Sequence, residues 1–112
     1  MTYHSFVTAR EDAIFRALAD PTRRAVFERL TLGEAAVKEI TARFDVSQPA
    51  ISQHLAALRK AGLVAERREG RNAYYRVNPA GLLPLVDWIE HYQAFWRDRI
   101  ERLRTTLEEM EE

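Results

Sequence analysis

Cysteine is absent from the 112-residue chain. Without thiols the chain can form neither a disulfide framework nor a thiolate metal site, and nothing in it argues for secretion. Apolar runs are short as well, and none approaches the roughly 20 residues that a membrane-spanning helix needs. The N-terminal sequence MTYHSFVTAR lacks the apolar centre of a signal peptide. We therefore expect a cytoplasmic protein with no membrane partner.

The chain also has no excess of positive or negative charge, because 17 basic residues balance 17 acidic ones. A net charge of zero, taken alone, argues against a polyanionic partner. The distribution reverses that argument, since residues 47–86 hold six basic and two acidic residues, whereas residues 87–112 hold four basic and eight acidic ones. A polyanion responds to the local field. The basic middle of the chain is therefore a candidate surface for nucleic acid.

Catalytic patterns are equally scarce. The chain shows no nucleophile with an evident base partner, no glycine-rich phosphate loop and no paired-carboxylate motif. We therefore expect neither an enzyme nor a cofactor. A chain of 112 residues is long enough for one compact domain, which we place at residues 1–112.

Two helix-start signals stand in the N-terminal part. Thr8 and Glu11 form a capping box that predicts a helix over residues 9–18. The pair Asp20-Pro21 predicts a second helix, because the aspartate accepts hydrogen bonds from free amides and proline needs no amide at the first helical position.

A helix-turn-helix pattern follows over residues 37–61. Its first helix ends near Asp45, for which we predict a sharp turn because aspartate tolerates the left-handed conformation. Ser47 is a good cap for the second helix. Apolar residues at helical spacing fix the buried side of that helix: Ile51, Leu55 and Leu58.

The hydrophobic period changes to that of strands after Gly62. Residues 64–69 and 73–77 predict two short strands, and the loop between them has the length and composition of a β-hairpin turn. This hairpin covers residues 64–77.

The last predicted helix covers residues 79–110, and its apolar stripe is longer than the rest of a small domain could bury. We therefore expect a homodimer formed by the helices at 9–18 and 79–110. The aromatic residues Trp88, Tyr92, Phe95 and Trp96 fit the same interface, although a groove there is also where a small-molecule inducer would bind. The predicted interface residues are Ile14, Leu18, Ile89, Tyr92, Trp96, Ile100, Leu103 and Leu107.

These elements predict a mainly α fold with a small β-hairpin wing: a winged helix-turn-helix of five helices that dimerises through its terminal helices. Such a fold reads double-stranded DNA with its second helix in the major groove, where glutamine and serine contact base edges or phosphates. Arginines on the wing reach backbone phosphates or the minor groove. The candidate DNA-binding residues are Ser47, Gln48, Pro49, Ser52, Gln53, His54, Arg59, Lys60, Arg67, Arg68 and Arg71.

The segments LADPTRRAVFERL and SQPAISQHLAALRKAGLVAERREGRNAYYRV resemble the ArsR/SmtB-type bacterial transcriptional repressors. The resemblance implies a dimer whose recognition helices enter successive major grooves of a palindromic operator, and repression that a signal relieves. By position it also implies DNA contacts from the residues Gln48, Ser52, Gln53 and His54, with wing contacts near Arg68 and Arg71.

The chain departs from that family at its familiar metal sites. Metal-sensing members carry two cysteines on the first helix of the motif, where this chain has Ala36 and Lys38. The Asp-x-His pair of other members is also missing, because Asp87 is followed by Trp88 and Ile89. We therefore predict no metal at these family sites.

Three other interpretations of the sequence remain possible in addition to a DNA-binding repressor. Asp87 and His91 form an i, i+4 pair that could hold a metal with help from Glu90 or His4, although a local polar contact is the more common role of such a pair. The winged helix could instead serve contacts between proteins. A sensor with an unrecognised metal or small-molecule site is the third possibility.

Overall fold

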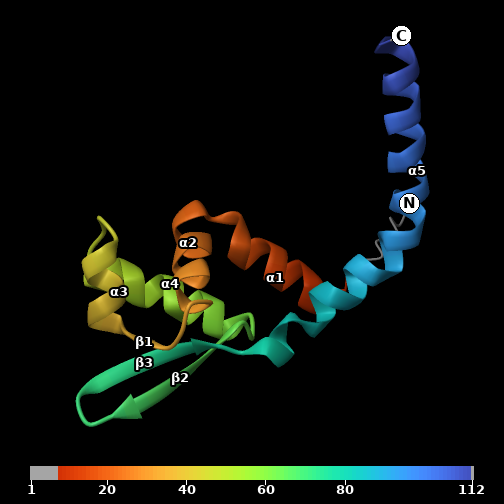
Figure 1. The fold of residues 1–112 in the computed structure, drawn as a ribbon. Helices are drawn as coiled ribbons and strands as arrows, with labels where there is room; N and C mark the ends of the chain where they lie inside the picture. Colours follow the sequence, from red (N-terminus) through yellow and green to blue (C-terminus); the bar gives the residue numbers. More distant parts are fainter. Residues whose placement is uncertain (1–7, 112) are drawn as a thin grey trace, which may run out of the picture.

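The computed structural model describes residues 8–111, except for the side chain of residue 94. Four helices form a cluster above a small sheet, and a long fifth α-helix runs past the cluster and away from it (Figure 1). In chain order the elements are α1 (Ala9–Ala19), α2 (Pro21–Leu30), β1 (Ala35–Ala36), α3 (Val37–Arg43), α4 (Gln48–Lys60), β2 (Val64–Glu69), β3 (Asn72–Val77), the 3-10 helix η1 (Pro79–Leu82) and α5 (Leu83–Glu111).

The predicted helix caps are confirmed. Thr8 Oγ1 accepts from the amide of Glu11 at 3.2 Å, while the amide of Thr8 donates to Glu11 Oε2 at 2.8 Å, which completes the capping box. Asp20 Oδ1 accepts from the amide of Arg23, the third residue of α2, at 2.9 Å. Ser47 Oγ accepts from the amide of Ala50 at 3.3 Å at the start of α4.

Helix α4 lies at the centre of the core, where it contacts α2, α3 and β2. The three apolar residues predicted to fix its buried side are completely buried. Around them pack side chains from every neighbouring element: Ile14, Val26, Leu30, Ile40, Leu63 and Val64. Burying one such aliphatic side chain stabilises the fold by about 1.5–3 kcal/mol, so this cluster fixes the orientation of α4.

The wing is a three-stranded antiparallel sheet in the order β1-β3-β2. Strands β2 and β3 form the predicted hairpin, in which Glu66 lies opposite Tyr75 and Arg67 opposite Tyr74. Gly70 makes the turn with a φ of 61°, which glycine adopts without strain. The third strand is a finding beyond the prediction, since β1 has only two residues and carries no periodic signal.

The prediction of five helices is wrong by one, because η1 precedes α5. The amide of Leu83 donates to the carbonyl of Ala80, as in a 3-10 helix. An α-helix would need the next amide to donate to that carbonyl, and Pro84 has none. The proline therefore separates the predicted 79–110 helix into two elements.

The turn predicted at Asp45 is present, since the chain bends between α3 and α4, but Asp45 does not adopt the left-handed conformation. Within residues 8–111, glycine is the only residue type with a positive φ. Phe44, at the C-terminal end of α3, has extended backbone with φ −115° and ψ 144°. Ser47 is also extended, with φ −70° and ψ 156°, and no residue of the connection has the left-handed conformation that glycine favours.

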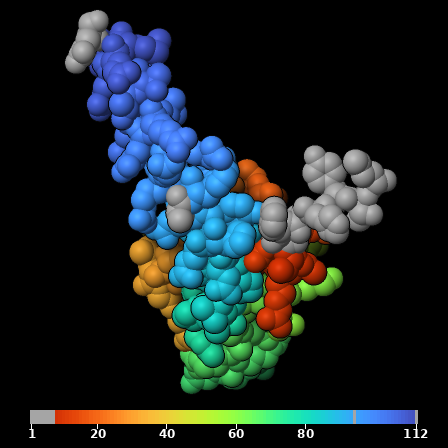
Figure 2. All heavy atoms as spheres, turned by 90° about the vertical axis from the view of Figure 1, so that its right-hand side faces the viewer, coloured from red at the N-terminus to blue at the C-terminus, as the bar shows by residue number. Residues whose placement is uncertain are grey.

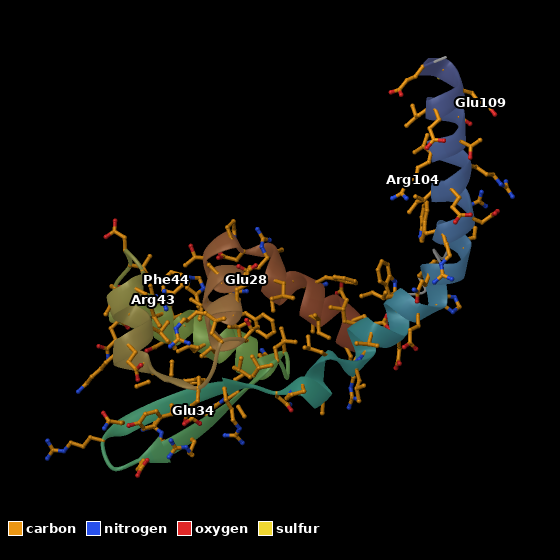
Figure 3. The ribbon with its side chains drawn as sticks, viewed as in Figure 1. Glu28, Glu34, Arg43, Phe44, Arg104 and Glu109 are labelled. Atoms are coloured by element: carbon orange, nitrogen blue, oxygen red, sulfur yellow. The ribbon has the colours of Figure 1, made fainter. Side chains whose placement is uncertain are left out.

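Helix α5 contacts α1 near its beginning and then projects from the body of the molecule (Figure 2). Side chains on its far part, such as Arg104 and Glu109, have no other element beside them (Figure 3). No helix within residues 8–111 combines the length and the apolar character that crossing a membrane requires.

Candidate nucleic-acid interface

One side of α4 is exposed and polar. Because Ile51, Leu55 and Leu58 point into the core, the positions between them face outward. The exposed residues on this side are Ser47, Gln48, Pro49, Ser52 and Gln53, all of them predicted DNA contacts. Their small and amide side chains can approach the edges of bases.

His54 lies on the flank of α4 and is half-buried. Its Nδ1 is buried and makes no hydrogen bond within the described residues. The side chain lies close enough to Asp20, at the start of α2, to act on that carboxyl: the pKa of Asp20 is lowered mainly by the amide of Arg23 and further by the charge of His54. His54 thus lies toward α2, apart from the exposed face.

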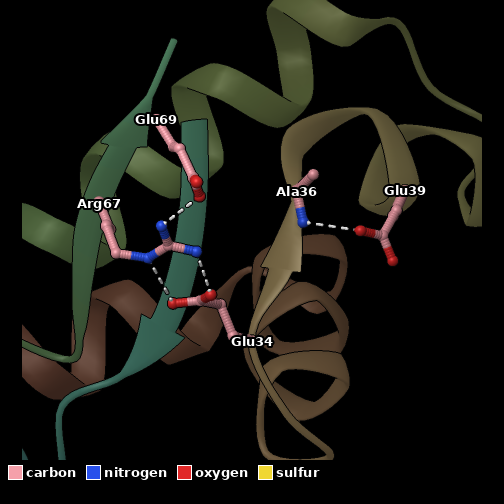
Figure 4. A network of polar contacts seen from close by, with 5 residues as sticks. All are labelled: Glu34, Ala36, Glu39, Arg67 and Glu69. Atoms are coloured by element: carbon pink, nitrogen blue, oxygen red, sulfur yellow. Dashed lines mark hydrogen bonds and ion pairs between the residues drawn. The ribbon is translucent and has the colours of Figure 1, made fainter. Parts of the chain in front are cut away.

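The hairpin of the wing has two faces, because successive side chains of a strand point to opposite sides. The outer face carries Arg67, which donates to Glu34 at 2.7 and 3.4 Å and to Glu69 at 2.7 Å (Figure 4). Its guanidinium also lies 4.6 Å from the ring centre of Tyr74. These contacts raise the pKa of Arg67, and Arg67 in turn lowers the pKa of Glu34. Arg67 therefore ties the wing to the segment ahead of α3.

The inner face of the wing carries Glu66 and Arg68. Arg68 Nε donates to Glu66 Oε1 at 3.0 Å, the hydroxyl of Tyr75 donates to Glu66 Oε2, and Arg59 of α4 lies 3.4 Å from the same oxygen. The Tyr75 hydroxyl and then Arg68 lower the pKa of Glu66, while burial and then Glu66 raise the pKa of Tyr75 to about 12. Glu66 therefore connects the end of α4 with the wing.

A crevice of about 240 Å³ separates the inner face of the wing from the exposed side of α4. It brings together four predicted DNA contacts, namely Gln48, Ser52, Arg68 and Arg71. Lys60 lies elsewhere, in a cavity that also has Arg10 of α1 in its lining. The predicted residues therefore divide into a group around the crevice and a group outside it.

Two charged residues of the crevice escape the sequence prediction: Lys38 and Glu66. Lys38 stands at the start of α3, and in the sequence it is notable only as the occupant of a missing cysteine position. Glu66 is one of the two acidic residues in the basic middle segment, and a count of charges gives it no role in DNA binding. Strand alternation, which puts Glu66 on the same side as Arg68, is the signal that could have found it.

The predicted interface residues lie in two different environments. Ile14 is only 1% exposed, so it packs inside its own chain and has no surface to offer a partner, and Leu18 is half-buried against the same core. Tyr92 on α5 is half-buried. The rest of the stripe is about half exposed: Ile89, Trp96, Ile100, Leu103 and Leu107.

Comparison with known proteins agrees with this architecture. The helix-turn-helix domain family matches residues 18–67. The HTH-type transcriptional regulator Rv2034 of Mycobacterium tuberculosis is 47% identical over 74 residues, which cover 66% of this chain and 69% of that protein. The transcriptional repressor SdpR of Bacillus subtilis is 33% identical over 79 residues, or 70% of this chain and 88% of that one.

A solved structure, that of the ArsR family transcriptional regulator RHA00566, superposes with a TM-score of 0.71 at 33% identity and covers 79% of this chain and 91% of that chain. The chain belongs to the ArsR family of transcriptional regulators. The winged-helix fold and the prediction of a regulator that is not an enzyme are thereby confirmed.

The metal candidates of this ArsR-family regulator lie between α1 and α5. Asp87 and His91 line a cavity of about 210 Å³ together with Glu11 and Trp88. Across the part of the chain that the structure describes, no three His, Cys, Asp or Glu side chains are grouped to hold a metal ion. His4 lies outside the described residues. Metal binding by Asp87 and His91 therefore stays a hypothesis.

Proposed function

We propose that this regulator is a homodimeric repressor that binds a palindromic operator in double-stranded DNA, with residues 1–112 acting as one winged-helix unit. Helix α4 enters the major groove, and the wing contacts the backbone or the adjacent minor groove. The observation that carries the proposal is the crevice, because it sets the polar side of α4 beside the inner arginines of the wing.

Base recognition falls to the exposed side of α4. Gln53 and Gln48 carry amides that pair with an adenine edge, and Ser52 donates to bases or phosphates. On the wing, Arg68 and Arg71 supply phosphate contacts. Arg67 has a different role, because its guanidinium is held by two carboxylates on the outer face.

The dimer rests on α5. Part of its exposed apolar stripe, namely Ile89, Trp96 and Ile100, lines a groove of about 520 Å³ together with Trp88 and Tyr92. Leu103 and Leu107 continue the stripe toward the C-terminal end of α5. Covering this stripe with the same stripe of a second copy removes apolar surface from water on both chains. Two copies of α4 then stand about 34 Å apart, one turn of DNA. A signal, including a small-molecule inducer, that shifts α1 against α5 changes this spacing.

The test is a mobility-shift titration with the DNA upstream of the chain's own coding region and with a scrambled duplex of equal length. We expect preference for the first duplex and a steep loss of affinity with salt. Gln53→Ala should reduce that preference by at least about 30-fold, because one bidentate base contact contributes about 1–3 kcal/mol of discrimination and the dimer loses two.

Arg102→Ala is the control for Gln53→Ala, since Arg102 lies on α5, where it pairs with Asp98 at 2.6 Å. It should bind both duplexes as the unaltered protein does. Equal, salt-independent affinity of the unaltered protein for both duplexes would contradict DNA recognition and favour a module for protein contacts.

A further inference from the structure

The crevice between α4 and the wing contains more positive charge than the sequence prediction assigned to it. Lys38 of α3 lines it beside Arg68 and Arg71 of the hairpin. Glu66 is the single carboxylate in its lining. Three cations from two separate elements therefore converge on one opening.

The partners of these side chains determine which charges are free. Arg68 and the hydroxyl of Tyr75 both engage Glu66. The side chains of Lys38 and Arg71 make no hydrogen bond or ion pair with any other described residue, and both residues are exposed. The crevice thus presents two cations that nothing in the described chain neutralises, one from α3 and one from the hairpin.

The position of the crevice suggests what these cations meet. One sugar–phosphate strand separates the major groove of a duplex from the neighbouring minor groove. If α4 enters the first groove and the wing reaches toward the second, the space between them receives that strand. This step rests on the proposed function, because it takes the placement of α4 from there.

We propose that the crevice holds the DNA backbone and that Lys38 is a phosphate contact, facing Arg71 across the same strand. A lysine ammonium is a compact charge with three donors, which suits a phosphate and carries no base preference. In a helix-turn-helix protein, the first helix of the motif crosses the backbone. Lys38 stands at the crevice end of that helix.

The experiment compares Lys38→Ala with Lys38→Arg and with the control Arg102→Ala, which removes a cation from the projecting part of α5. Binding to the upstream duplex and to the scrambled duplex is followed by fluorescence anisotropy between about 50 and 300 mM salt. Each lost phosphate contact lowers the slope of log affinity against log salt by about 0.9. The dimer loses two such contacts, so the slope falls by about 1.8, which is about 60-fold in affinity near 0.1 M salt.

We expect Lys38→Ala to show that loss equally on both duplexes, and Lys38→Arg and Arg102→Ala to follow the unaltered protein. Circular dichroism confirms that each variant is folded, and Lys38→Gln replaces the alanine variant if it is not. An unchanged slope for Lys38→Ala, with salt-dependent binding of the unaltered protein, overturns the backbone contact and leaves the proposed function standing. A loss confined to the upstream duplex also overturns it. Absence of DNA binding by the unaltered protein overturns both proposals.

Discussion

Leu103 provides a direct test of the proposed dimer, because it stands within the α5 stripe with 58% of its surface exposed. We expect Leu103→Ala to weaken the dimer without disturbing the helix. Alanine has the highest helix propensity of all residues. Truncating an exposed leucine also opens no cavity in the chain's own core. A weaker dimer would therefore report on the interface itself.

The size of the effect follows from the exposed area. Leucine has three carbons that alanine lacks, and burying each of them stabilises by about 0.8 kcal/mol. If the dimer covers the exposed 58% of Leu103, each protomer loses about 1.4 kcal/mol. Both protomers carry the change, so the dimer loses about 2.8 kcal/mol, which raises its dissociation constant about 100-fold.

Sedimentation equilibrium over a concentration series measures that constant. Thr105→Ala is a matched control, because Thr105 stands two residues after Leu103, about 200° round the helix, and lines a groove on the other side of α5 with Asp98 and Arg102. The control should dimerise as the unaltered protein does. If Leu103→Ala has the dissociation constant of the unaltered protein, the stripe is not the interface and the reasoning from its exposure fails.

Two further predictions concern the wing. Arg67→Ala should keep the salt slope of DNA binding, since its guanidinium is held on the outer face. Arg68→Ala should lower that slope by about 1.8, because each protomer of the dimer loses one phosphate contact. Equal slopes in salt titrations of the two variants would refute the division of the wing into two faces. Glu66 has a pKa below its ordinary value of 4.5, so its contacts stabilise the fold above that pH and lose their effect as the pH falls through the lowered pKa. The free energy of unfolding of Glu66→Gln should therefore lie below that of the unaltered protein at pH 6 to 8. The difference should shrink as the pH falls below 4.5 and through the lowered pKa. A difference that stays constant as the pH falls below 4.5 in urea titrations would contradict the ionic role.

The helices could be predicted because their signals are local. A capping box or a serine cap fixes where a helix starts, and apolar spacing fixes which side is buried. The strand β1 could not be predicted, since Ala35 and Ala36 form a strand only through pairing with β3, distant in sequence. The apolar spacing also could not show that η1 and α5 are two elements. Their boundary arises because Pro84 has no amide N–H to donate to the carbonyl of Ala80.

The site could be predicted to a smaller extent. Residues that are close in the sequence can be assigned to one region, but the direction of each side chain depends on the element that carries it. His54 is instructive: it lies three residues after Ile51 and four before Leu58, so helical spacing already sets it beside the buried stripe. Arg67 and Arg68 are similar, since alternation alone sends them to opposite faces. Glu34, which determines what Arg67 does, lies 33 residues away and leaves no such signal.

The contacts of the wing limit how a signal can act on DNA binding. Glu66 ties the inner face to α4, Arg67 ties the outer face to the segment ahead of α3, and the core beneath α4 is closed. Close-packed parts resist deformation. Helix α5, in contrast, projects from the body of the molecule, and the apolar side chains of its stripe are about half exposed. We infer that a signal alters the spacing between two rigid reading units by moving α5, because reshaping one unit would break several contacts together; an inducer found bound between α4 and the wing would contradict this inference.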